Sequence, residues 1–217
     1  MQKLDPRAIS ALTILNRYSA YLLARLQADP GLTSLAEVIQ KRHAALFSSI
    51  FGLWSAQRER AAALAVRDEM TYQLDVALRS LRTAVLAFTH NDRHSKMYTA
   101  LFPKGFSDVL ERNPSHKLIL ARKMLQELAA FDHPVSAQAV EELRAAVDGL
   151  GGAMDALEGA KRAEQAAVST LETAKRSYCT HYEETYHKLV LALGDRPRAD
   201  GFFHRTRLRR SEVVSER

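Results

Sequence analysis

The fold is decided by residues 46–88, LFSSIFGLWSAQRERAAALAVRDEMTYQLDVALRSLRTAVLAF, which contain no proline and a single glycine. Large apolar side chains recur there at heptad spacing, at Leu46, Ile50, Leu53, Leu64, Leu74, Leu78, Leu81, Val85 and Phe88. An apolar seam that repeats every seven residues lies along one face of an α-helix and packs against another helix. The stretch therefore predicts one long helix of a coiled coil or helical bundle.

A second run with the same pattern lies in the C-terminal half. It extends from about residue 136 to Leu193 without a proline, and Gly194 and Pro197 follow it as stop signals. Its seam consists of Val147, Leu150, Met154, Leu157, Val168, Leu171, Tyr178, Tyr182 and Leu189. The first run extends upstream to Ser34, which has capping-box spacing to Glu37. Each predicted helix is about 85 Å long, at about 1.5 Å per residue.

A shorter predicted helix precedes each long one. The first opens at Asp5-Pro6 and stops at Asp29-Pro30, and the other opens at Asn113-Pro114 and stops at Asp132-His133-Pro134. This short-long, short-long order suggests an internal duplication, because a shift of 104 residues brings the breakers of the two halves into register.

Together these elements predict an all-α protein, an elongated antiparallel helical bundle or coiled coil of residues 1–195. Its pseudo-repeats are residues 1–92 and 113–195, joined by a connector of residues 93–112, and a basic tail of residues 196–217 follows. The antiparallel arrangement is favoured because each short helix then covers a different end, whereas a parallel pair leaves more apolar surface in water. The alternative is a compact six-helix bundle in which the chain reverses near residues 57–60 and 161–164, although no turn-forming residue lies there.

Composition agrees with a folded helical chain and indicates its compartment. Of the 217 residues 47% are hydrophobic and 26% charged, with only nine glycines and six prolines. The single Cys179 has no disulfide partner within the chain, which favours a reducing compartment. The first residues lack the apolar core of a signal peptide, and the longest uncharged run, residues 43–57, is shorter than the roughly 20 residues that span a bilayer. We therefore expect a cytoplasmic protein.

Polar residues interrupt both heptad seams near their midpoints. They are Gln57, Arg60 and Arg67 in the first long run and Lys161 and Glu164 in the second. The favoured interpretation is a partly hydrated polar layer that fixes the register of the helices, with Arg60 and Glu164 close enough to meet. The alternative, a site for a small anion, would need more convergent hydrogen-bond donors.

Two groups of aromatic residues are candidates for partner binding. Phe47, Phe51 and Trp54 add to the apolar residues of the first seam, so one core-facing stripe cannot bury them all. Either the first short helix covers the extra side or another subunit docks there. Phe102 and Phe106 make the connector unusually apolar, and we expect them to plug against the bundle in preference to forming a partner-binding loop.

The C-terminal tail is the most basic segment. Residues 196–217 contain seven arginines, and Arg205, Arg207, Arg209 and Arg210 are the candidates for binding an anion. Such an arm is able to contact the phosphates of a nucleic acid or an anionic membrane surface. The favoured interpretation is a solvated end whose Phe202 and Phe203 are pinned to the bundle, because no nucleic-acid-binding motif accompanies the charge.

No catalytic or metal-binding motif emerges from the sequence. Glu184 and His187 have the Glu-x-x-His spacing of di-iron bundles, but Ser80 and Thr83 occupy the corresponding positions of the first half. We therefore expect no metal, no cofactor and no enzyme activity. The hypothesis is a non-enzymatic helical scaffold or adaptor that binds protein partners and self-associates. The alternatives are a nucleic-acid or anionic-surface binder and a ferritin-like metal or small-ligand bundle.

Overall fold

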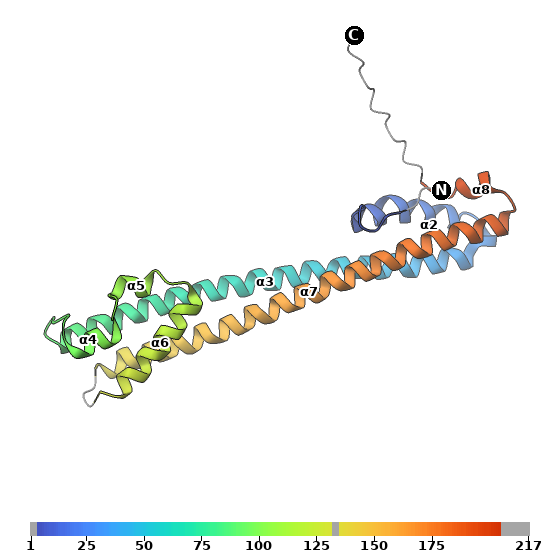
Figure 1. The fold of residues 1–217 in the computed structure, drawn as a ribbon. Helices are drawn as coiled ribbons and strands as arrows, with labels where there is room; N and C mark the ends of the chain where they lie inside the picture. Colours follow the sequence, from blue (N-terminus) through green and yellow to red (C-terminus); the bar gives the residue numbers. More distant parts are fainter. Residues whose placement is uncertain (1–3, 132–134, 205–217) are drawn as a thin grey trace, which may run out of the picture. The chain divides into compact units, whose positions relative to one another are not determined.

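The computed structural model describes residues 4–131 and 135–204. Within those ranges every regular element is a helix, so the prediction of an all-α protein is confirmed (Figure 1). The chain divides into two compact units, which we call unit 1 (Met1–Ala56 and Glu164–Arg217) and unit 2 (Gln57–Ala163). No helix of the described ranges is long and apolar enough to cross a lipid bilayer.

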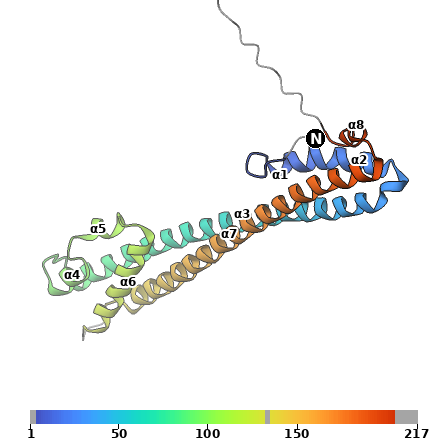
Figure 2. The same cartoon turned by 45° about the vertical axis from the view of Figure 1, so that its right-hand side comes forward.

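Two long helices run through the chain, as predicted. Helix α3 spans Thr33–Phe88 and α7 spans Ala137–Leu193, and neither is interrupted at residues 57–60 or 161–164 (Figure 2). The alternative in which the chain reverses at those points is therefore wrong. The capping role expected of Ser34 falls to Asp29, whose carboxylate accepts a hydrogen bond of 3.0 Å from the N–H of Gly31 in a 3-10 turn, Pro30–Leu32, that leads directly into α3.

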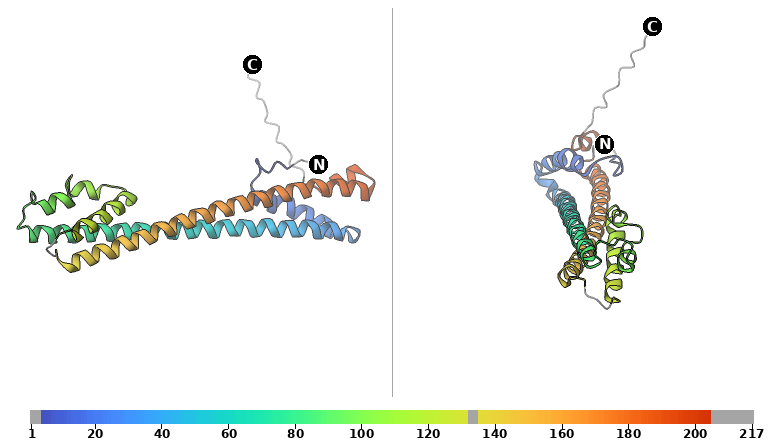
Figure 3. Two further views of the ribbon diagram at one scale, coloured as in Figure 1. Left: turned by 60° about the horizontal axis from the view of Figure 1, so that its bottom comes forward. Right: turned by 90° about the vertical axis from the view of Figure 1, so that its left-hand side faces the viewer.

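Unit 1 is a three-helix arrangement. Residues 33–56 of α3 and 164–193 of α7 run antiparallel, and the N-terminal segment packs on both (Figure 3). That segment comprises α1 (Ala11–Thr13), a π-helix (Ile14–Ser19) and α2 (Ala20–Gln27). This helix begins later than expected, at Ala11, and Ser10 caps it because its hydroxyl accepts a hydrogen bond from the N–H of Thr13. Asp5-Pro6 forms a turn, since the carbonyl of Asp5 accepts from both Ala8 and Ile9.

The start of the basic tail also belongs to unit 1. Gly194 ends α7 with a φ of 63°, a left-handed conformation that costs glycine nothing. A short helix, α8 (Arg196–Asp200), then turns the chain back so that Phe202 and Phe203 are only 5% and 2% exposed. This agrees with the interpretation that the two phenylalanines are pinned to the bundle.

Unit 2 combines residues 57–88 of α3, residues 137–163 of α7 and a third helix, α6 (Pro114–Ala129). The predicted start of α6 is confirmed, because Asn113 caps it by accepting from the N–H of His116. Lys117 of α6 is buried, and its ammonium donates to both carboxylate oxygens of Asp75 on α3 at 2.7 and 2.8 Å. A buried pair of this kind fixes the register of two helices, since sliding either one leaves a charge unpaired.

The connector is more ordered than the sequence suggests. It contains α4 (Lys96–Leu101) and α5 (Phe106–Leu110), and Phe102 between them is 3% exposed within the unit 2 core. Phe106 is half-buried with its ring 5.5 Å from that of Phe102, and the guanidinium of Arg82 lies 5.1 Å over it. The connector thus plugs unit 2, as the favoured interpretation expected.

Replacing Leu22, which lies on α2, by alanine tests how far the N-terminal helix stabilises unit 1. The side chain of Leu22 is fully buried, so Leu22→Ala is expected to lower the free energy of unfolding by about 2–5 kcal/mol. Leu191→Ala, at a side chain that is 84% exposed on α7, is the matched control and should change it by less than about 0.5 kcal/mol. Urea unfolding followed by circular dichroism measures both. Equal effects of the two substitutions would contradict the packing described.

Candidate docking surface

Three aromatic side chains lie together on the solvent side of α3 in unit 1. Phe47, Phe51 and Trp54 are 50%, 52% and 45% exposed. Their spacing of four and three residues places them on one helical face, and their rings touch in series, with centroids 4.8 Å apart for Phe47 and Phe51 and 5.4 Å for Phe51 and Trp54. We call these three residues the aromatic face.

The aromatic face is uncovered because the same part of α3 carries a second apolar side. Leu46 and Ile50, which alternate with the aromatic residues along the chain, are 0% and 5% exposed in the unit 1 core. A helix turns about 100° per residue, so the two sets point in different directions. Of the two possibilities left open by the sequence, burial by the first short helix does not occur, since about half of each aromatic side chain remains in water.

Small residues border the aromatic face. Ala44, Ser48, Gly52 and Ser55 are all exposed, and a Cβ added at Gly52 would meet nothing within 4 Å. No charged residue occurs from Ala44 to Ala56. Aromatic residues without charged neighbours are typical of the buried centre of protein interfaces, whereas exposed helix surfaces are usually rich in charge.

The polar residues expected at the helix midpoints are mostly solvated. In unit 2, Gln57, Arg60 and Lys161 are exposed and Arg67 is half-buried. Arg67 pairs with the adjacent Asp68, and Lys161 lies 3.5 Å from Glu158 one turn away. Glu164, which falls in unit 1, is half-buried.

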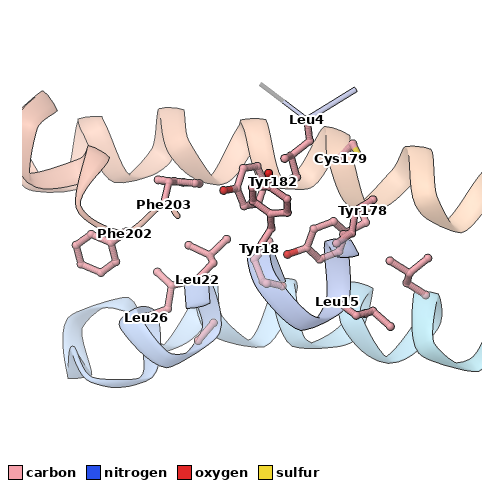
Figure 4. Close-up of a cluster of buried hydrophobic side chains, with 14 of the residues drawn as sticks. Leu4, Leu15, Tyr18, Leu22, Leu26, Tyr178, Cys179, Tyr182, Phe202 and Phe203 are labelled. Atoms are coloured by element: carbon pink, nitrogen blue, oxygen red, sulfur yellow. The ribbon is translucent and has the colours of Figure 1, made fainter. Parts of the chain in front are cut away.

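Sequence reasoning missed a dense aromatic cluster in the core of unit 1 (Figure 4). Tyr178 and Tyr182 of α7 are fully buried, and the ring of Tyr182 stacks edge-on against Tyr18 and Phe203, with centroids 6.3 and 4.8 Å away. Burial raises the pKa of Tyr178 and of Tyr182 well above the usual range. The heptad positions of Tyr178 and Tyr182 predicted their burial, but the segments that cover them could not be identified from the pattern.

A serine–histidine pair and a cysteine of unit 1 lie beside this cluster. The hydroxyl of Ser19, on the π-helix, is 2.8 Å from Nδ1 of His43 on α3, and partial burial lowers the pKa of that histidine. Cys179 is 4% exposed, and burial raises its pKa to about 11. A nucleophile must reach its substrate as a thiolate or an activated hydroxyl. Ser19 is buried, and Cys179 is both buried and kept as a thiol by its raised pKa, so neither side chain is placed to attack a substrate in solution.

The groove of unit 1 and the cavity of unit 2 contain few polar groups that point toward a common centre. In unit 1 a groove of about 500 Å³ runs between α3 and α7, but the hydroxyls of Ser49, Thr170 and Thr173 each donate to a carbonyl of their own helix. In unit 2 a cavity of about 280 Å³ beside α5 and α6 has an apolar floor, and at its rim Arg112 is paired with Asp108 at 2.7 Å. These polar groups are already satisfied within the chain.

The remaining candidates from the sequence are not brought together. Glu184 and His187 are both exposed on α7, and the described ranges contain no group of three or more histidine, cysteine or carboxylate side chains that could hold a metal ion. Arg205, Arg207, Arg209 and Arg210, proposed to bind anions, lie outside the described residues. Among the sequence candidates within residues 4–131 and 135–204, the aromatic face is therefore the set that forms an exposed cluster.

Comparisons with protein-family models, with curated proteins and with solved structures found no match to this chain.

The thiol of Cys179 should be unreactive in the native protein. Because it is buried and its pKa is about 11, less than about one part in a hundred is thiolate at pH 8. We expect a disulfide reagent such as DTNB to label the native chain at least about 100-fold more slowly than the chain in denaturant. Ser48→Cys, which places a thiol at an exposed position of α3, is the control and should label rapidly. Fast labelling of the native wild type would contradict the packing of Cys179.

Proposed function

We propose that this protein is a non-enzymatic helical scaffold that works by binding proteins through exposed helix faces and that self-associates. The observation that carries the proposal is the aromatic face: three large aromatic side chains, each about half exposed, touching one another on a helix segment without charge. Leaving such side chains in water costs free energy in proportion to their apolar area, so an occupant that covers them gains that energy.

The helical geometry supports recognition of another helix. Phe47, Phe51 and Trp54 occupy the i, i+4 and i+7 positions by which an amphipathic helix enters an apolar groove or pairs with a second helix. Aromatic residues are also the side chains that contribute most to binding energy at the centre of interfaces. The polar groups that line the core and the grooves of the described ranges supply no competing site, because they are buried, paired or scattered.

The first test is self-association of the intact chain and its dependence on the aromatic face. Sedimentation at increasing concentration should give a mass that rises above the 24.3 kDa of one chain. Phe51→Ser should weaken association by about 30-fold or more, because it removes a central aromatic contact of roughly 2 kcal/mol. Leu191→Ser, also in unit 1 and 84% exposed, should leave association unchanged.

A wild-type chain that sediments as a monomer at every concentration would contradict self-association. A chain that associates equally well with Phe51→Ser would show that another surface is used. Circular dichroism of each variant establishes that the helices are intact.

The second candidate function is binding of nucleic acid or another anionic surface through the basic tail. It is favoured by charge alone: residues 196–217 hold seven arginines and three acidic residues, and the whole chain has a net charge of +6. Contacts between arginine and phosphate release counterions, so such binding weakens steeply as salt is added.

Removing residues 205–217 separates the two candidates. If the tail binds nucleic acid, the truncated chain should lose affinity for DNA and RNA by about 10-fold or more at low salt, and the dependence of affinity on salt should flatten. Fluorescence anisotropy with labelled oligonucleotides measures both. The truncation ends after His204, so it keeps the buried Phe202 and Phe203, and unit 1 should unfold at the same temperature. Equal affinity of the two chains would remove this candidate.

We further propose that the scaffold arose by internal duplication and that the protein acts in the cytoplasm. Two parallels support the duplication: each unit contains a segment of α3, a segment of α7 and a shorter helix packed on both, and each short helix is followed by a long one. The single cysteine, buried and without a disulfide, supports a reducing compartment.

A further inference from the structure

We propose that the occupant of the aromatic face is a second copy of this chain, and that the α3 segments of the two copies pair antiparallel about a two-fold axis beside residue 49. This inference rests on the proposed function and names the partner that the docking surface binds. It concerns unit 1 alone.

The solvent side of α3 carries a second heptad seam. Ala44, Phe47, Phe51 and Trp54 are spaced by three, four and three residues, which is the spacing of alternating a and d positions in a coiled coil. All four are exposed, whereas Leu46 and Ile50 of the core seam are buried. The first half of α3 is therefore built to contact helices on two sides, and unit 1 itself fills only one of them.

The sizes of the side chains select the antiparallel orientation. With the axis beside residue 49, Phe47 faces Phe51 of the second copy and Trp54 faces Ala44, so the largest residue meets the smallest one. In a parallel pair each residue would face its own copy: tryptophan would oppose tryptophan and alanine would oppose alanine. That arrangement combines overcrowding at one level with a void at another, and both are unfavourable.

The residues beside the seam allow the two helices to approach closely. Ser48 and Ser55 flank the aromatic residues on one side, and Gly52 lies beyond them with open space around its Cα. Small side chains at flanking positions let aromatic rings of the opposite helix lie against the backbone. No charge is buried in the contact, because the segment from Ala44 to Ala56 is uncharged.

Charge also favours a protein occupant over a lipid surface. Attachment to an anionic membrane relies on lysine and arginine residues interleaved with the apolar ones, and the segment from Ala44 to Ala56 that carries the aromatic face has neither. The chain as a whole has a charge of +6, so two copies repel at long range. An uncharged contact surface is the arrangement in which that repulsion costs least.

The apolar area of the aromatic face sets the affinity expected for the dimer. Three half-exposed aromatic side chains supply roughly 300 Å² of apolar surface per copy, compared with roughly 800 Å² per partner in a standard interface. The aromatic face is then the centre of a modest interface that its small neighbours complete, and we expect a dissociation constant on the order of micromolar.

Site-directed crosslinking tests the register. In Ser48→Cys the new thiol lies one residue from the axis, so the thiols of two copies come within reach of a disulfide or a short bismaleimide. Ala45→Cys is the matched control, since Ala45 lines the groove on another side of α3. Mild oxidation of the full-length chain at concentrations around the dissociation constant should give covalent dimers of Ser48→Cys, at least about 10-fold more than of Ala45→Cys. The wild type should give none, because Cys179 is buried.

Each alternative outcome has a definite meaning. If light scattering shows that the wild type is monomeric throughout, both the proposed self-association and this inference fail. If the wild type associates but Ser48→Cys does not crosslink preferentially, self-association stands and the antiparallel pairing is overturned. If the monomer floats with phosphatidylglycerol vesicles and Phe51→Ser abolishes flotation, the face binds lipid and the second copy is overturned as its occupant.

Discussion

A helix with apolar side chains on two faces needs two partners, and in unit 1 the chain covers only one of these faces of α3. The core side, with Leu46 and Ile50, is closed by α7 and the N-terminal helices. The other side keeps Phe47, Phe51 and Trp54 about half in water. Hydrophobic free energy is proportional to the area removed from water, so the proposed self-association depends on this imbalance.

In the rest of the described structure, the polar side chains are either buried in a core, where they are packed or paired, or exposed to solvent. Tyr178, Tyr182 and Cys179 are buried in the unit 1 core, and Lys117 pairs with Asp75 in unit 2. Groove hydroxyls such as that of Thr173 bond to their own helix. Catalysis needs polar groups that converge on a reachable point, and these groups either lack access or already have a partner.

The sequence predicted those parts of the fold that depend on local and periodic signals. The long helices follow from heptad seams without proline, and Asn113-Pro114 and Gly194 set boundaries that the structure confirms. What could not be predicted depends on contacts between distant segments. The N-terminal helix begins after Ser10 and passes through a π-helix in which Tyr18 and Ser19 are both buried. Neither this π-helix nor the ion pair of Lys117 with Asp75 has a local signature in the sequence. The aromatic face was identified as a surplus of apolar residues, but its exposure depends on where the short helices pack.

Trp54 is the single tryptophan of the chain and lies within the aromatic face, so its fluorescence reports directly on whether that face becomes covered. The account predicts that, as protein concentration rises through the micromolar range, the emission maximum moves to shorter wavelength and quenching by acrylamide falls by about half. Emission and quenching that stay those of a half-exposed indole at every concentration, while sedimentation shows association, would contradict it, because the chains would then be joining through another surface.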